Sequence, residues 1–118
     1  MTSDKDFIGF GLHDAVLEQL IVHWPEGTVV IQLSATAPTP QNVVITATGI
    51  LQVVCPRHQP WGTGDHVFYV NDVRTTVEPE APSHTRLEIE MGSGDILTFV
   101  AKHIERASSP RQPVHENH

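Results

Sequence analysis

The sequence predicts an all-β protein: a small single-domain antiparallel β-sandwich or strongly curved sheet of about six strands, with little helix. Valine, isoleucine and threonine together number 33, against 24 for alanine, leucine, lysine and glutamate. Branched side chains lose rotamer freedom on a helix and pack well on a pleated surface. Clusters of turn-forming residues also divide the chain into segments of strand length. They lie at residues 25–27, 37–40, 60–64, 79–82 and 92–95.

The first hairpin is predicted from residues 17–24 and the apolar segment that follows them. Residues 17–24 fit both a helical spacing and an alternating pattern, but only a strand explains both segments. We expect Glu26 and Gly27 to form a two-residue turn. That register would place Trp24 opposite Val29, Val22 opposite Ile31 and Leu20 opposite Leu33. Residues 7–15, before this hairpin, are expected to add a short edge strand or a turn.

Two longer strands are expected in the middle of the chain, at residues 43–54 and 66–77. Gly49 interrupts the alternation of the first, which indicates a bulge or bend. The second carries apolar residues on both faces. That pattern is typical of a central strand, or of a strand that spans two layers.

The last hairpin has the clearest alternation in the chain, with Leu87, Ile89 and Met91 on one face. A three-residue loop, residues 92–94, would use the conformational freedom of Gly94. It sets Ile89 opposite Leu97 and Leu87 opposite Phe99. A two-residue loop would bury glutamates against the apolar face, which is costly.

Length and composition predict how the chain is organised. The chain has 118 residues, the size of one domain. We expect residues 1–6 to be flexible, residues 7–106 to form the single β domain, and residues 107–118 to be a disordered tail because they show no apolar period.

Charge and hydropathy exclude several classes of function. The formal net charge is −7, and no stretch is rich in lysine or arginine. Nucleic acids and anionic membrane surfaces are therefore not expected as partners. No window resembles a membrane span or a signal peptide, so we expect a cytoplasmic protein.

Three motifs resemble those of a group of short, uncharacterised bacterial proteins. They are Leu12-His13-Asp14-Ala15, Pro60-Trp61-Gly62 and the segment of residues 87–95, and their order and spacing match over residues 7–106. Members of this group carry a polar residue where Gly92 stands and a Pro-Ser pair in place of Thr63-Gly64. The group is similar in size and style to immunity proteins of bacterial toxin systems. Those proteins bind and block one cognate toxin, so the resemblance implies a binding function.

Neither a metal site nor a catalytic nucleophile is predicted, and no cofactor is expected. Six of the eight histidines are scattered singly, and the one close pair lies in the expected tail. Structural zinc sites instead use ligands in short pairs. Cys55 ends an apolar strand, where a buried thiol is the ordinary interpretation. His13 and Asp14 are adjacent and would point to opposite faces of an extended chain, so Asp14 is expected to cap a turn.

The segment of residues 56–65 is the strongest candidate for a recognition surface. It brings Arg57, His58, Trp61 and Asp65 into one connection. Tryptophan and arginine are enriched among binding hot spots. The alternative is structural: Trp61 would cover one end of the fold, and Arg57 would pair with a carboxylate such as that of Asp95.

These observations favour a non-enzymatic module that binds a protein partner, with immunity proteins as the analogy. The alternative is a small-molecule-binding or hydrolytic domain, whose pocket would gather His13, Arg57, His58, Trp61 and Asp95. Glu88 and Glu90 are expected to form a solvated acidic face that could also attract a basic partner. A homodimer joined through the half-polar strands is kept open beside the monomer.

Overall fold

The computed structural model describes residues 8–36, 39–57 and 69–110 of the chain. These residues form six strands: β1 (Val16–His23), β2 (Thr28–Ala35), β3 (Gln41–Val54), β4 (Val70–Val77), β5 (Thr85–Met91) and β6 (Ile96–Pro110). Within the described residues, no helix is long and apolar enough to cross a lipid bilayer.

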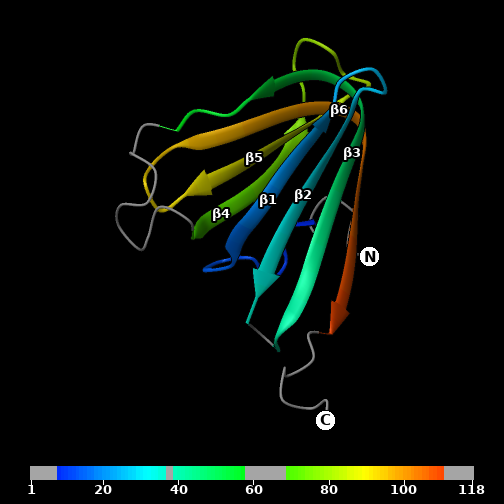
Figure 1. Cartoon of the computed structure of the whole chain (residues 1–118). Helices are drawn as coiled ribbons and strands as arrows, with labels where there is room; N and C mark the ends of the chain where they lie inside the picture. Colours follow the sequence, from blue (N-terminus) through cyan, green and yellow to red (C-terminus); the bar gives the residue numbers. More distant parts are fainter. Residues whose placement is uncertain (1–7, 37–38, 58–68, 111–118) are drawn as a thin grey trace, which may run out of the picture.

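All six strands belong to one antiparallel sheet in the order β1-β2-β3-β6-β5-β4 (Figure 1). The prediction of an all-β, antiparallel, six-stranded domain is therefore confirmed, and the strands form one sheet. The two edge strands approach each other at one point, where Val16 forms an isolated bridge with Tyr69, just before β4. The sheet therefore curls strongly, as Figure 1 shows, although it does not close.

The hydrophobic core fills the inside of the curl. Alternate residues of β2 and β3 point inward, and Val29, Ile31, Val43 and Ile45 are each fully buried. Central strand β6 contributes Phe99, which is also fully buried. Because the side-chain period of a strand is two, each strand supplies one apolar row to the same interior.

The last hairpin has the predicted register. Ile89 lies opposite Leu97 and Leu87 opposite Phe99. Gly94 has a φ of 97°, and its N–H donates to the carbonyl of Met91 at 2.9 Å. The three-residue loop is thus confirmed. As expected, it turns the apolar sides of both strands toward the core.

The first hairpin forms, but its predicted register is wrong by two residues. Leu20 lies opposite Ile31 and Val22 opposite Val29. The connection is a four-residue turn, in which the N–H of Gly27 donates to the carbonyl of Trp24 at 3.1 Å. Pro25 explains the shift, because its fixed φ suits the second position of a turn. A shift of two preserves the buried face, but it leaves Trp24 in the turn with 79% of its surface exposed.

The long strand β3 bends where Gly49 interrupts it, as expected. Gly49 has a φ of 67°, and a Cβ there would lie 2.7 Å from the Cβ of Lys102. The register of β3 against β6 then shifts between Ile50 and Gln52. No side chain larger than hydrogen fits at position 49 without displacing β6.

The prediction of a central position for the strand that ends at residue 77 is wrong, because β4 is an edge strand. Its expected start at residue 66 lies outside the described residues. Val70 and Val73 lie against the chain before β1, whereas Val77 is 50% exposed. A Cβ on Gly9 would lie 2.8 Å from the carbonyl oxygen of Val73, and the N–H of Asp14 donates to the carbonyl of Val70 at 2.7 Å.

Residues 8–15 form turns, the second of the two expected alternatives. The N–H of Leu12 donates to the carbonyl of Gly9, and that of Ala15 to Leu12. Ile8 and Leu12 are buried in the core. This segment, here called the N-terminal cover, lies over the inner face between β4 and β6.

Strand β6 corrects the expected tail boundary. It runs to Pro110, and Ala107 lies opposite Val44 of β3, so residues 107–110 are part of the sheet. The sequence pattern did not predict this extension, because residues 107–110 show no apolar period. The remaining expected flexible or disordered segments, residues 1–6 and 111–118, lie outside the described residues.

Arg106 anchors the N-terminal cover to the sheet. It lies opposite the buried Ile45 and therefore points toward the interior. One of its terminal nitrogens donates to the carbonyl of Ile8 at 3.1 Å and to that of Phe10 at 2.6 Å. Burial lowers the pKa of this guanidinium. The two carbonyls offset that desolvation by accepting charge-assisted hydrogen bonds.

Replacing Arg106 with methionine should therefore destabilise the protein by about 1–3 kcal/mol, because two backbone carbonyls lose a charged donor. Methionine keeps most of the aliphatic volume, so the loss reports the hydrogen bonds. Urea unfolding measures the change. Arg106→Lys, which keeps the charge on a single donor group, should lie between wild type and Arg106→Met. Equal stability of all three proteins would contradict this role.

Candidate functional site

The structure places the predicted site residues at different positions. Arg57 follows β3 and is exposed, and His13 lies in the turn before β1. Asp95 is in the β5–β6 loop with 8% of its surface exposed. His58, Trp61 and Asp65 lie outside the described residues, so their expected roles stay predictions.

The start of β4 is the place where three separate parts of the chain meet. The N–H of Asp14 donates to the carbonyl of Val70 and the N–H of Val70 to that of Ala15, both at 2.7 Å. From the β5–β6 loop, the N–H of Gly92 donates to the carbonyl of Tyr69 at 2.8 Å. These bonds define what is called here the β4 junction. His13 and the loop that contains Asp95 therefore flank the same point of the sheet.

His13 and Asp14 adopt an arrangement that sequence reasoning missed. Asp14 has a φ of 71°, a left-handed conformation that aspartate tolerates better than most residues. The chain is thus not extended here. His13 Nε2 lies 3.7 Å from Asp14 Oδ1, and His13 Nδ1 donates to the carbonyl of Asn71 at 2.7 Å. The expectation that the two side chains point apart applied to an extended backbone, a condition that this segment does not meet.

A pocket of about 320 Å³ opens at the β4 junction. It is lined by Asp14, Tyr69, Val70, Asn71 and Gly92. Tyr69 is 41% exposed, so its ring is accessible from solvent. Three described residues were expected to form a pocket, and none of them lines this one. His13 precedes the lining residue Asp14, and Asp95 lies in the same loop as the lining residue Gly92. Arg57 lies elsewhere, after the end of β3.

Asp95 has a clear structural role in the β5–β6 loop. Its carboxylate accepts a hydrogen bond from Ser93 Oγ at 2.9 Å, and the N–H of Asp95 donates back to that hydroxyl at 3.3 Å. Its carbonyl accepts from the N–H of Met91 at 2.8 Å. These local bonds fix the loop that supplies Gly92 to the pocket.

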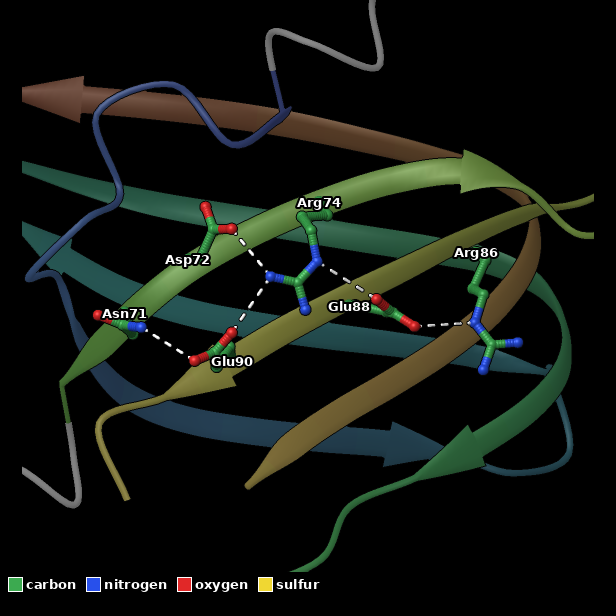
Figure 2. Close-up of polar contacts among 6 residues, drawn as sticks. All are labelled: Asn71, Asp72, Arg74, Arg86, Glu88 and Glu90. Carbon is green, nitrogen blue, oxygen red and sulfur yellow. Dashed lines mark hydrogen bonds and ion pairs between the residues drawn. The ribbon is translucent and has the colours of Figure 1, made fainter. Parts of the chain in front are cut away.

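The outer face of β4 and β5 carries a network of ion pairs centred on Arg74 (Figure 2). Arg74 contacts Asp72 at 2.9 Å, Glu90 at 3.2 Å and Glu88 at 3.4 Å. These hydrogen bonds, that to Asp72 foremost, raise the pKa of Arg74. Asn71 Nδ2 donates to Glu90 at 2.9 Å, which connects the network to the pocket.

Arg86 extends the network along β5. It contacts Glu88 at 3.0 Å and Glu78 at 3.1 Å, and these bonds raise the pKa of Arg86. The face expected to be a solvated row of glutamates is therefore a paired one. Four carboxylates share two guanidinium groups, which leaves a negative excess. The ion pairs could have been predicted by aligning residues 66–77 against residues 87–91 as antiparallel strands. Oppositely charged residues then become cross-strand neighbours.

Two further expectations concern cysteine and metal chemistry. Cys55 is exposed, so the expectation of a buried thiol is wrong, although partial desolvation still raises its pKa. The strand ends before Cys55 and leaves it outside the core. In the described part of the chain, no three histidine, cysteine, aspartate or glutamate side chains are grouped closely enough to hold a metal ion.

Comparisons with known proteins bear on the fold alone. No family model matches the chain, and no curated protein shows significant similarity to it. Among solved structures, the chain is similar to an uncharacterized protein from Neisseria gonorrhoeae, with a TM-score of 0.59 and 13% sequence identity. The match covers 80% of this chain and 90% of that chain. At this identity the similarity supports a shared fold.

Arg74→Met should destabilise the protein by about 1 kcal/mol, because three neighbouring carboxylates would lose their shared cation at a partly exposed site. The difference should shrink in about 1 M salt, which screens the remaining repulsion. Urea unfolding at two salt concentrations measures both effects. The matched control is Lys102→Met, which removes the same charge from an exposed position. Equal losses in the two variants would contradict a special role for Arg74.

Proposed function

We propose that this protein is a non-enzymatic module that binds a protein partner through a surface at the end of β3. The observation that carries the proposal is the exposure of Trp24, at 79%, in the turn between β1 and β2. Tryptophan is the residue type most enriched among binding hot spots, because it offers a large and rigid contact area.

The surface around Trp24 is held rigidly. The N–H of Ile50 donates to the carbonyl of Gly27 at 3.1 Å, which ties the turn to β3. Leu51 and Val54, the next exposed apolar residues along β3, are 61% and 44% exposed. Trp24, Leu51 and Val54 are called here the β3-end surface. Little conformational entropy would be lost when such a fixed surface binds.

The end of β3 also offers backbone groups for binding. Strand β2 pairs with β3 only as far as Thr48, so among the described residues the segment beyond Ile50 pairs on one side alone, with β6. Unpaired strand edges accept further strands. Arg57, the first residue of the expected recognition loop, lies three residues after the end of β3.

The charge of the chain favours a basic partner. The net charge is −7, and the paired face of β4 and β5 retains a negative excess. Complementary charge accelerates association and favours the correct partner. The resemblance to immunity proteins supports a toxin as that partner, since immunity proteins bind one toxin each.

The test is capture of a partner from lysate of the natural source cells, followed by titration with the purified partner. Trp24→Ala should weaken binding about 30-fold or more, as expected for a central hot spot. Arg57→Ala should weaken it less. Val77→Ala is the matched control, since Val77 is 50% exposed on β4. All three variants should keep wild-type stability because the side chains are exposed.

Two results would contradict the proposal. One is a captured partner whose affinity Trp24→Ala does not change. The other is a dimer, detected by light scattering, that Trp24→Ala dissociates. In that case a second copy of the chain covers the β3-end surface, and the expectation of a homodimer replaces that of a separate partner.

A further inference from the structure

The pocket at the β4 junction lies apart from the β3-end surface and offers a second binding site. We propose that it binds a guanidinium or alkylammonium group. This inference goes beyond the proposed function, since it concerns other residues and would stand if the β3-end surface bound nothing. The cation could be supplied by an arginine or lysine side chain of a protein, or by a free small molecule.

Among the described residues, two side chains that line the pocket carry acceptor oxygens. Asp14 presents a carboxylate whose side chain is 75% exposed. Asn71 donates one Nδ2 hydrogen to Glu90, and its Oδ1 can accept from a ligand. A guanidinium group carries only donors, so it complements this pair of acceptors.

Three of the backbone donors of the lining residues are already used. The N–H groups of Asp14, Val70 and Gly92 donate to the carbonyls of Val70, Ala15 and Tyr69. Anion sites in proteins depend on free backbone N–H groups. The pocket therefore favours a cation over a phosphate or a carboxylate.

Tyr69 supplies a second kind of attraction for a cation. Tyr69 lines the pocket and is 41% exposed as a residue. The face of an aromatic ring attracts cations within about 6 Å of its centre. The volume of about 320 Å³ lies at the lower end of the range for ligand pockets, which suits one charged head group.

The acidic side chains next to the pocket also favour a cation. Glu90 and Asp72 lie next to the pocket through Asn71, and Arg74 is bound to both of them. The Arg74 guanidinium is therefore committed to three carboxylates. His13 is held by the carbonyl of Asn71 at the pocket rim, and its Nε2 lies 3.7 Å from Asp14 Oδ1, so a bound cation would share that carboxylate with His13.

The site is tested by titrating the full-length protein with N-acetylarginine methylamide and with agmatine, observed through backbone amide NMR shifts. The amides of Asp14, Asn71 and Gly92 should shift together. N-acetylcitrulline methylamide, which has the same shape without the charge, should produce no such shifts. Tighter binding of N-acetylarginine methylamide identifies a protein side chain as the source, and tighter binding of agmatine identifies a free cation.

Asp14→Asn is the decisive variant, because asparagine also tolerates a positive φ and differs from aspartate mainly in charge. It should weaken binding about tenfold or more. Glu26→Gln, at the far turn of the first hairpin, removes the same charge and should leave the affinity unchanged. Tyr69→Leu should weaken binding about threefold, and Tyr69→Phe should not.

Three results would overturn the proposal: no shift with either cation, equal shifts with the citrulline probe, or unchanged affinity in Asp14→Asn. If Asp14→Asn fails to fold, its NMR spectrum shows this directly. The Tyr69→Leu and Tyr69→Phe pair then decides, because both lose the hydroxyl group and only phenylalanine keeps an aromatic face for the cation.

Discussion

The hydrogen bonds between the chain before β1 and the start of β4 are the constraint on which the rest of the structure depends. Residues 14 and 15 exchange two bonds of 2.7 Å with Val70 and so join the two edges of one sheet. A sheet held at both edges must curl, and the curl turns six apolar rows toward one interior. The N-terminal cover then seals that interior, with Arg106 as its anchor.

The same constraint separates the surfaces by chemistry. Where the edges meet, turns from three parts of the chain produce a pocket rich in acceptors beside Asp14. Pairing with β2 stops at Thr48, and β3 continues paired with β6 alone, with Leu51 and Val54 exposed. Arg74 and Arg86 pair with four carboxylates on the outer face of β4 and β5, which leaves a negative excess on that face. Each surface thus follows from strand length and register.

The alternation within a hairpin predicted which face of each strand is buried, although the predicted register of the first hairpin was wrong by two residues. The register of β5 and β6 followed from keeping Glu88 and Glu90 off the core, and the bend at Gly49 followed from its interrupted pattern. Long-range contacts were not predictable in this way. Edge strand β4 packs against the chain before β1, where Gly9 approaches Val73, and β6 extends to Pro110 by pairing with β3. Neither contact is visible in the sequence of the strand itself. The contact between His13 and Asp14 was not predicted, because the left-handed backbone of Asp14 is set by its hydrogen bond at the β4 junction.

Hydrogen exchange of the Asp14 and Val70 amides tests this account most directly. If the β4 junction holds the curl, both amides should open only when the whole protein unfolds, and their exchange should match that of core amides such as Phe99. Asp14 would then be protected although its side chain is exposed and its neighbours form turns. Rapid exchange at both positions, with a protected Phe99, would show that the edges separate independently and would contradict the account.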